Sequence, residues 1–253
     1  MTMNAFSLTG RVALITGGNG GIGRAIALGL AGAGADVVVA ARNPAKTARV
    51  VEEARALGRR AVGVVCDVQR TADLEAALAV ASQLGGLDIL VNNAGVSSAN
   101  LPERIAEDEW DRVLDTNLKA VFLGCKLAHP LLKARGGGKI INIGSEYSLF
   151  GSPFVVSYAA SKGGVIQLGK SLAIAWARDQ IQVNTIIPGW IRTDMTAVVE
   201  ASEPFANQIR QRTPAGRFGE PEELAGTAVF LASAASNFVT GQALCVDGGY
   251  SIT

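Results

Sequence analysis

The sequence predicts an α/β fold, with one parallel sheet of seven strands carrying helices on both faces. Three observations support this prediction. Short runs rich in Val and Ile alternate with longer Ala-rich and Leu-rich amphipathic segments along the whole chain. There are seven such strand-like runs, which suggests one sheet. No linker, repeat or low-complexity tract interrupts them, so residues 1–253 are expected to form a single domain.

The expected strands are short and apolar, as burial on both faces of a sheet requires. In chain order they cover residues 11–16, 36–40, 61–66, 87–92, 139–144, 181–187 and 242–247. The helical segments begin near residues 21, 44, 71, 106, 119, 156 and 221. Right-handed crossovers are expected between the parallel strands. The glycines at 136–138 are expected to end a helix just before a strand.

The alternation is irregular once, at residues 189–220, between the sixth strand and the last helix. A long connection that follows the carboxyl end of a parallel strand is a common place for substrate-covering loops. We therefore expect this segment to cover a substrate.

Composition excludes several classes of function. Hydrophobic residues make up 49% of the chain and charged residues 18%, which is typical of a globular protein with a sizeable core. Lys and Arg number 23 against 22 Asp and Glu, so no general attraction to nucleic acid or anionic membrane is expected. The three cysteines form no CxxC pair, and neither a signal peptide nor a membrane helix is expected, which favours the cytoplasm. No metal site is indicated, because the lone histidine, His129, has no clustered ligands.

A glycine-rich stretch, TGGNGGIG at 16–23, joins the first strand to the first helix. It fits two overlapping spacings, GxGxxG and TGxxxGxG, and the sequence does not choose between them. Either spacing lets the backbone approach a pyrophosphate at a helix N-terminus, although such turns also occur without a ligand. The position after the first strand predicts a Rossmann-type dinucleotide site. Its expected cofactor contacts are Gly17, Asn19, Gly21, Ile22 and Gly23.

The end of the second strand bears on the choice of cofactor. A NAD site usually has Asp or Glu there, whereas this chain has Ala40, Ala41 and then Arg42. Arg42 suits a ribose phosphate, so NADP(H) is favoured and NAD(H) remains possible. The alternative is that Arg42 is a solvated residue that begins a loop. Past the third strand, Asp67 and Val68 are expected near the adenine, or Asp67 caps the next helix.

Tyr158 and Lys162 stand four positions apart in a helical segment, so their side chains share one face. Lowering the pKa of a phenol from about 10 to about 7 needs roughly 4 kcal/mol, which a nearby ammonium and an oxidised nicotinamide can supply in part. Such a pair would be a general acid and base. The bare YxxxK motif is also compatible with a packed tyrosine and a solvated lysine.

Further motifs occur in a fixed order around this pair. They are TGxxxGIG, NNAG at 92–95, Asn117 in DTNLKAVF, INIGS ending at Ser145, YxxxK, and PGWIRT at 188–193. Together they resemble the classical short-chain dehydrogenase/reductase family over essentially the whole chain. The resemblance implies that Tyr158 exchanges a proton with the substrate, Lys162 lowers the pKa of the phenol and holds the nicotinamide ribose, Ser145 bonds the substrate oxygen, and Asn117 positions a relay water.

The same resemblance implies the remaining cofactor contacts. Asn92, Asn93, Ala94 and Gly95 would line the adenosine side, and Pro188, Gly189, Ile191 and Thr193 would bracket the nicotinamide. Pro188 and Gly189 also fit an ordinary turn. Hydride would pass between the nicotinamide and a carbonyl or carbinol carbon, with no metal needed.

The carboxyl-terminal sequence resembles two groups of bacterial members of this family. One group oxidises sugars and sugar acids, including gluconate and 2-deoxygluconate, and the other reduces 3-oxoacyl-carrier-protein thioesters. An acyl-carrier reductase needs a basic entrance, and Lys133, Arg135 and Arg178 are few and interrupted by Asp179. A sugar or sugar acid is therefore favoured as substrate, with an acyl-thioester or small-ketone reductase as the alternative.

Four further expectations concern the assembly, an alternative function and two residues near the proposed site. The resemblance implies a homotetramer. A non-catalytic dinucleotide-binding regulator is the remote alternative function. Glu146 stands where small or apolar residues are commoner, so it is either a surface residue or, if it faces the substrate, a sign of a polyol or an amine-bearing ketone. Trp190 is a candidate wall of the substrate pocket.

Overall fold

The computed structural model describes residues 5–253. Within them, seven strands form one sheet that is parallel throughout, in the order β3-β2-β1-β4-β5-β6-β7. The strands are β1 Val12–Thr16, β2 Asp36–Ala41, β3 Ala61–Val65, β4 Ile89–Asn92, β5 Gly138–Ile143, β6 Ile181–Pro188 and β7 Ala243–Val246. The predicted fold class is thus confirmed, and every predicted strand end lies within two residues of the observed one.

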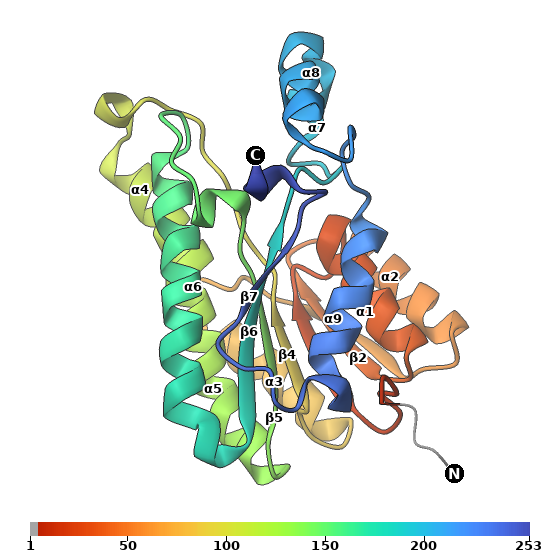
Figure 1. Ribbon diagram of the computed structural model, residues 1–253. Coiled ribbons are helices and arrows are strands. Elements are labelled where there is room, and N and C mark those ends of the chain that lie inside the picture. Colours follow the sequence, from red (N-terminus) through yellow and green to blue (C-terminus); the bar gives the residue numbers. More distant parts are fainter. Residues whose placement is uncertain (1–4) are drawn as a thin grey trace.

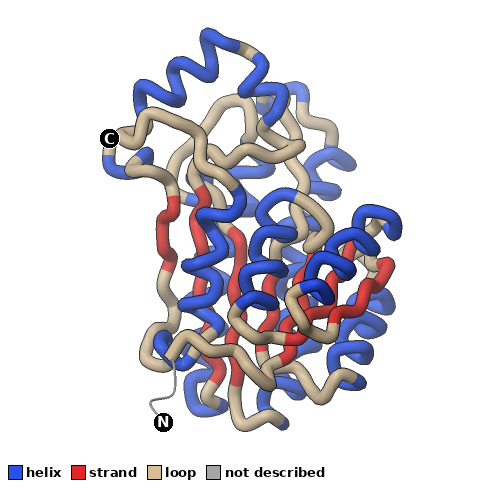
Figure 2. The backbone as a smooth tube through the Cα atoms, turned by 90° about the vertical axis from the view of Figure 1, so that its right-hand side faces the viewer, coloured by secondary structure: helices blue, strands red, loops and turns tan. Residues whose placement is uncertain are grey.

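Helices cover both faces of this sheet (Figures 1 and 2). One face carries α1 Gly21–Gly32, α2 Pro44–Ala56 and α9 Ala225–Ala232, and the other carries α3 Thr71–Gln83, α5 Ala120–Ala134 and α6 Val156–Trp176. Successive residues of β1 point to opposite layers: Ile15 joins the first core and Leu14 the second. Burial on both faces explains why the strands are apolar without alternation. No helix within residues 5–253 is long and apolar enough to cross a membrane.

The sheet reverses its winding direction between β1 and β4. Thr16 at the end of β1 pairs with Ala40 of β2 on one side and with Asn92 of β4 on the other. Connections leave in opposite directions from these neighbouring strands, which opens a crevice at their carboxyl ends. This is the position at which ligands bind in open α/β sheets.

Helix α4 (Glu107–Leu114) continues into α5 without a break. The sequence predicted separate starts near 106 and 119, whereas the structure joins the two helices through a π-helical turn, Asp115–Lys119. Such a turn inserts one residue into the helix and occurs frequently at functional sites. It contains Asn117.

The connection between β6 and α9 contains two helices that the sequence did not predict. They are α7 Ala197–Ala201 and α8 Glu203–Arg212, and they stand beyond the carboxyl ends of the strands (Figure 1). Short 3-10 turns complete the chain: η1 Pro102–Arg104, η3 Glu146–Ser148, η4 Ala177–Asp179, η5 Pro221–Leu224, η6 Ala234–Ser236 and η7 Tyr250–Ile252.

Candidate active site

The glycine loop between β1 and α1 has a conformation that requires glycine. Gly17 and Gly21 have φ of +64° and +48°, a region that favours glycine. A Cβ on Gly23 would lie 2.3 Å from the Gly17 carbonyl oxygen, so the helix can pack on the loop only without a side chain there. Gly20 begins α1 with no side-chain cap, and nothing lies within 4 Å of where its Cβ would stand. Free N–H groups facing open space fit a pyrophosphate.

The loop after β4 is bonded directly to the glycine loop. The Asn93 side-chain amide donates to the carbonyl oxygens of Thr16 and Gly17, each at 3.0 Å. The Thr16 hydroxyl accepts from the backbone N–H groups of Asn93 and Ala94 at 3.1 and 3.2 Å. Asn92 is buried and donates to Asn142 and Cys125, so its side chain supports the strands rather than lining the loop.

The end of β2 presents a cation beside the glycine loop. Arg42 is exposed and has no ion-pair partner within residues 5–253. The Asn19 side chain bonds the carbonyl oxygen of Asn43 at 3.3 Å, which connects the glycine loop to this strand end. Lys46, which sequence reasoning missed, lies in the first turn of α2 and forms an ion pair with Asp194 at 3.0 Å. Its only sequence signal is its nearness to Arg42.

Asp67 and Val68 follow β3 at the same edge of the sheet. Asp67 accepts a hydrogen bond from the N–H of Gln69 at 3.1 Å, and Val68 is buried. Helix α3 begins after Arg70 without a side-chain cap, so the helix-capping alternative for Asp67 is wrong.

Tyr158 and Lys162 lie together on the first turns of α6, as their spacing predicted. The Lys162 ammonium is 5.7 Å from the Tyr158 ring centroid and donates to the carbonyl oxygen of Ile143 at 2.7 Å. Burial lowers the pKa of Lys162 to about 8. Burial raises the pKa of Tyr158, and a hydrogen bond with Ser145 opposes that rise. The protein's own groups therefore do not produce the predicted lowering of the phenol pKa.

Ser145 lies two residues beyond the end of β5 and is fixed by the turn that follows it. Its hydroxyl accepts from the N–H of Tyr147 at 3.2 Å, and its own N–H donates to the Ser148 hydroxyl at 3.1 Å. This reciprocal cap begins the turn η3. It holds the Ser145 hydroxyl at the Tyr158 phenol.

Asn117 is fully buried in the π-helical turn, and its side chain is occupied. Its amide donates to the carbonyl oxygen of Val96 at 2.8 Å and to the Ser161 hydroxyl at 3.1 Å, while its oxygen accepts from the Val96 N–H at 2.8 Å. These bonds tie α6 to the segment that follows β4. A Cβ on Gly95 would lie 3.3 Å from the Asn117 oxygen and 3.6 Å from the Lys162 ammonium.

The segment after β6 reaches back to the glycine loop. Pro188 ends the strand, Ile191 is buried, and the Cγ2 atom of Thr193 lies 3.1 Å from the Cβ position of Gly21. A Cβ on Gly189 would come within 2.5 Å of the Cα of Asp247, so this turn packs tightly against the end of β7. The sequence-predicted site residues thus gather at the carboxyl ends of the strands.

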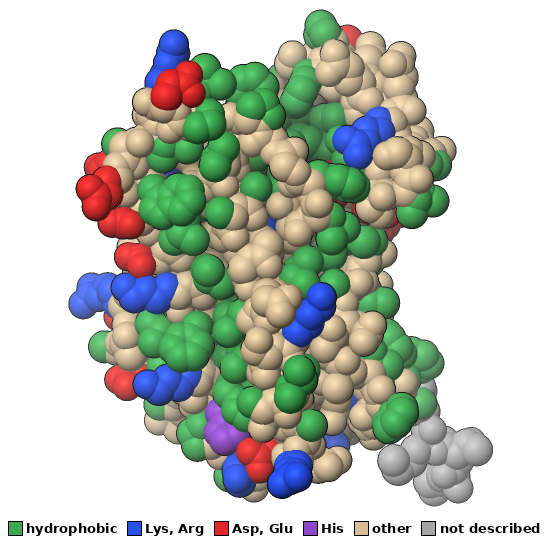
Figure 3. All heavy atoms as spheres, turned by 60° about the vertical axis from the view of Figure 1, so that its left-hand side comes forward, with side chains coloured by type: hydrophobic (Ala, Val, Ile, Leu, Met, Phe, Trp, Pro, Cys, Tyr) green, Lys and Arg blue, Asp and Glu red, His purple; other side chains and the backbone are tan. Residues whose placement is uncertain are grey.

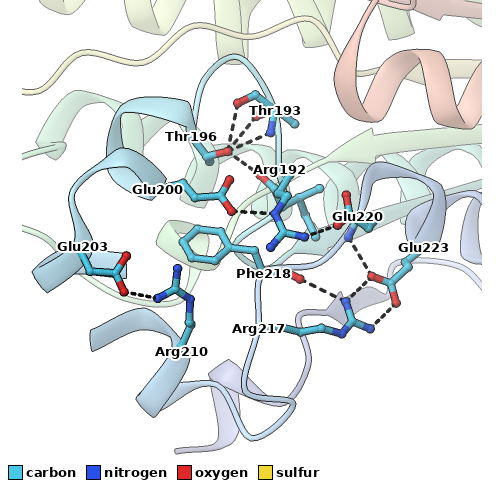
Figure 4. Close-up of polar contacts among 11 residues, drawn as sticks. Arg192, Thr193, Thr196, Glu200, Glu203, Arg210, Arg217, Phe218, Glu220 and Glu223 are labelled. Carbon is cyan, nitrogen blue, oxygen red and sulfur yellow. Dashed lines mark hydrogen bonds and ion pairs between the residues drawn. The ribbon is translucent and has the colours of Figure 1, made fainter. Parts of the chain in front are cut away.

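Ion pairs connect the segment containing α7 and α8 to the rest of the molecule (Figure 4). Arg192 forms an ion pair with Glu200 of α7 at 2.7 Å and a second with Glu220 just before η5. Arg217 pairs with Glu223 at 2.7 Å. Arg192, near the start of the segment, is therefore tied both to α7 and to the residue that precedes η5.

Aromatic rings surround the entrance beside Tyr158. The ring of Tyr147 is edge-on to that of Tyr158 at 6.2 Å and to that of Trp190 at 6.3 Å. Trp190 in turn contacts Phe205 and Phe218 at 6.2 Å each. Sequence reasoning considered Trp190 but gave Tyr147 no role. We call Tyr147, Trp190, Phe205 and Phe218 the aromatic cluster.

Glu146 lies beside this cluster and is not a surface residue. Its exposed fraction is 4%, so the surface alternative for it is wrong. Burial and, to a smaller extent, the charge of Asp247 raise its pKa to about 8, and the charge of Arg212 opposes both effects.

His129 is far from these residues in the chain and has a packing role. Its ring lies 4.7 Å from that of Trp176, and its Nε2 atom is 2.8 Å from a carboxylate oxygen of Asp179. Within the described part of the chain, no group of three or more His, Cys, Asp or Glu side chains is arranged to hold a metal ion.

Known proteins share this arrangement over the full chain. A family model described as Enoyl-(Acyl carrier protein) reductase matches residues 17–251. The 2-dehydro-3-deoxy-D-gluconate 5-dehydrogenase of Escherichia coli K12 is 42% identical over 252 residues, covering 99% of each chain. The structure of a gluconate 5-dehydrogenase from Burkholderia cenocepacia J2315 in complex with NADP and tartrate has a TM-score of 0.95 at 41% identity, covering 100% of both chains. A short-chain type dehydrogenase/reductase from Mycobacterium marinum has a TM-score of 0.94 at 37% identity, again covering 100% of both chains. The chain therefore belongs to the short-chain dehydrogenase/reductase family.

Proposed function

We propose that the protein transfers hydride between NADP(H) and a secondary alcohol or ketone of a sugar acid. The observation that carries this proposal is the placement of Ser145, Tyr158 and Lys162 around one point beside the glycine loop. The nicotinamide cofactor donates or accepts the hydride when it is bound. Full-length similarity to two sugar-acid dehydrogenases supports the substrate class.

Each side chain of the tetrad has a role that its surroundings support. Tyr158 gives a proton to the substrate oxygen during reduction and takes it back during oxidation. Ser145 bonds the same oxygen, because the η3 turn holds its hydroxyl next to the phenol. Lys162 holds the ribose and favours the phenolate with its charge. The Asn117 side chain is occupied by Val96 and Ser161, so its main chain is the better candidate to bind the relay water.

The predicted cofactor contacts fit NADP(H). Gly17, Gly21 and Gly23 allow the loop to pack tightly against its neighbours, Thr193 among them, and the open space beside Gly20 suits the pyrophosphate. Arg42 is an exposed cation at the end of β2, where no carboxylate competes with a ribose phosphate. The Burkholderia relative holds NADP. NAD(H) is the second candidate.

We further propose that residues 1–253 act as one domain in which 189–220 covers the substrate. Helices α7 and α8 stand over the carboxyl ends of the strands (Figure 1). The ring of Trp190, which precedes them in the chain, is edge-on to that of Tyr147, and Tyr147 is edge-on to Tyr158. The cover is therefore placed to exclude water from the reacting carbon.

An acyl-thioester reductase is less well supported. Two of the three basic residues considered for an acyl-carrier entrance, Lys133 and Arg135, lie at the end of α5, just before β5 begins, whereas the site lies where the strands end. Lys133 pairs with Asp179 at 2.8 Å and Arg135 with Asp88 at 3.2 Å. A non-catalytic regulator is disfavoured because Tyr158, Ser145 and Lys162 stand together.

We also propose that the protein acts in the cytoplasm as a homotetramer. Two surfaces support self-association. The edge strand β7 is half-exposed, and a hollow of about 460 Å³ opens between α4, α5 and α6, lined in part by Leu114, Leu118 and Phe122. Hydrophobic side chains are scattered over that side of the molecule in Figure 3. Sedimentation equilibrium checks the assembly, and a monomer would contradict it.

Initial rates test the proposed activity directly. Gluconate, 2-deoxygluconate, their keto forms, a small cyclic ketone and an acetoacetyl thioester are each assayed with NADP(H) and NAD(H). We expect the highest kcat/KM with a sugar acid and the NADP couple. Preference for the thioester, or no activity with any sugar acid, would contradict the proposed substrate class.

A further inference from the structure

Two buried polar atoms beside Tyr158 lack a partner in the protein. Within residues 5–253, three buried side-chain atoms have no hydrogen bond: Glu146 Oε1, Trp190 Nε1 and Asn142 Nδ2. Asn142 lies in β5 and accepts from Asn92, whereas the other two lie at the aromatic cluster. Because buried polar groups are nearly always bonded, an orphan pair at a binding site indicates groups that a ligand satisfies.

The two residues that carry these orphan atoms are both neighbours of Tyr147. Glu146 precedes Tyr147 in the chain, and Trp190 is edge-on to Tyr147 at 6.3 Å. Tyr147 is also edge-on to Tyr158, and Ser145 immediately precedes Glu146. Glu146 acts electrostatically on Tyr158, and Trp190 is linked to Tyr158 through the Tyr147 ring, so both residues adjoin the proposed acid and base.

Glu146 has the chemistry of a hydroxyl ligand rather than of an ion. No cation forms an ion pair with it in the described chain. The charged or titratable groups facing it are Asp247, Arg212, Tyr147 and Tyr158. Burial keeps its carboxyl protonated at neutral pH, with a pKa of about 8. A protonated carboxyl offers both a donor and an acceptor, the pair that an alcohol group requires.

We propose that Glu146, together with the indole N–H of Trp190, binds a hydroxyl group of the substrate near its reacting carbon and thereby selects polyhydroxylated carbonyl compounds. This inference rests on the proposed function and names the residues that would recognise a hydroxyl group of the sugar acid. The faces of Tyr147 and Trp190 suit the C–H surface of a sugar chain, while the two orphan atoms take its hydroxyls.

The thermal stability of a Glu146 variant distinguishes a ligand-binding role of this carboxyl from a structural one. A carboxyl buried for structural reasons would have a partner in the fold, and its removal would destabilise the protein. A carboxyl kept for a ligand costs stability in the free enzyme, so its removal should stabilise the protein while activity falls.

The test uses Glu146→Met, Glu146→Gln and Trp190→Phe, with Glu75→Met as the control on the exposed face of α3. Methionine matches the length of glutamate without its polar atoms, and glutamine keeps a donor and an acceptor. Rates are measured with ketogluconates and with analogues that each lack one hydroxyl, and Tm is measured at pH 7.

We expect Glu146→Met to lower kcat/KM at least tenfold for the full ketogluconate and less than threefold for one deoxy analogue, mainly through KM, while Tm rises. Trp190→Phe should likewise lower the ratio of kcat/KM for the full ketogluconate to kcat/KM for that deoxy analogue. Glu146→Gln and Glu75→Met should retain the wild-type ratio. A Glu146→Met enzyme with unchanged ratios, or with lower Tm and equal losses on all substrates, would overturn the inference alone. A wild-type enzyme inactive with every polyhydroxylated compound would overturn the proposed function as well.

Discussion

Without a bound cofactor, the surroundings of the Tyr158 phenol do not favour its ionised form. Burial raises its pKa, and the Lys162 ammonium spends its short hydrogen bond on the Ile143 carbonyl oxygen. Because a phenol with a raised pKa stays protonated at neutral pH, it has a proton to give to a ketone but cannot accept one from an alcohol. The positive charge of an oxidised cofactor is therefore needed, beside that of Lys162, to favour the phenolate.

Removing this phenol should abolish turnover without removing the cofactor site. We expect Tyr158→Phe to lower kcat by at least about 100-fold, because proton transfer is lost, while the Kd for NADPH changes less than threefold. Steady-state rates and fluorescence titration measure the two quantities. Tyr250→Phe serves as the control for loss of a phenol elsewhere. Equal rates for Tyr158→Phe and wild type would refute the acid–base role.

Arg42 should decide between the two cofactors. A charge-assisted hydrogen bond contributes about 1.5–3 kcal/mol, so Arg42→Ala should raise KM for NADPH roughly 10–100-fold. NADH lacks the phosphate and should change less than threefold. Arg49→Ala, another exposed arginine on the neighbouring helix, is the matched control. Equal losses for both cofactors would show that Arg42 does not bind the phosphate.

Glu146 should make stability depend on pH. Its pKa is raised from 4.5 to about 8, so between these values the unfolded chain releases a proton that the folded protein retains. The free energy of unfolding should therefore fall as pH rises through this window, by about 2–5 kcal/mol in total, and level off above pH 8. Urea unfolding at pH 5, 6.5 and 8 measures it. Glu146→Gln should show a decline smaller by this amount; parallel curves would contradict the prediction.

Among the elements, the pair α7 and α8 depends most on distant contacts. Arg192 holds Glu200 of α7 and Glu220 before η5, whereas Arg210 pairs with Glu203 inside α8. At the end of α8, Arg212 donates to the Tyr250 hydroxyl at 3.1 Å, and its carbonyl oxygen accepts from the Thr253 hydroxyl at 2.9 Å.

Breaking the Arg192 contacts should loosen this pair of helices locally. In Arg192→Met, amide exchange of residues 197–212 should quicken several-fold while that of β5 stays unchanged, because surface ion pairs contribute little to global stability. Mass-spectrometric hydrogen exchange measures both. Arg210→Met is the control, and similar exchange in the two variants would show that Arg192 does not anchor the segment.

The sequence predicted the strands but not these two helices. The strands were predicted to within two residues because burial on both faces leaves an uninterrupted apolar run such as KIINIG. Helix α8 has a polar sequence, and only Ala206 and Ile209 are buried, beside Phe218. The direction of the Tyr158 pKa and the pairing of Lys46 with Asp194 likewise depend on neighbours far apart in the chain.

At the scale of the whole molecule, the two cores share the same strands. Ile140 packs in one core and its neighbour Ile141 in the other, both fully buried. If the helices on one face of the sheet lost their packing, the strands that support the core on the other face would therefore be exposed.

Unfolding should accordingly be one cooperative event. We expect far-UV circular dichroism and tryptophan fluorescence to give coincident urea transitions, as a single domain requires. Ile141→Ala should lower the unfolding free energy by about 2–5 kcal/mol and shift both signals together. Two separated transitions would contradict the single-domain proposal.

The strand order has a consequence for synthesis on the ribosome. The first 65 residues contain β1, β2 and β3, which are neighbours in the sheet and can pair as soon as they emerge. The other edge of β1 belongs to β4, so it remains uncovered until residues 89–92 have been made. Over that interval the nascent chain presents an apolar strand edge, which is a target for chaperones or for a neighbouring nascent chain. Slowing translation before codon 89 should therefore increase aggregation.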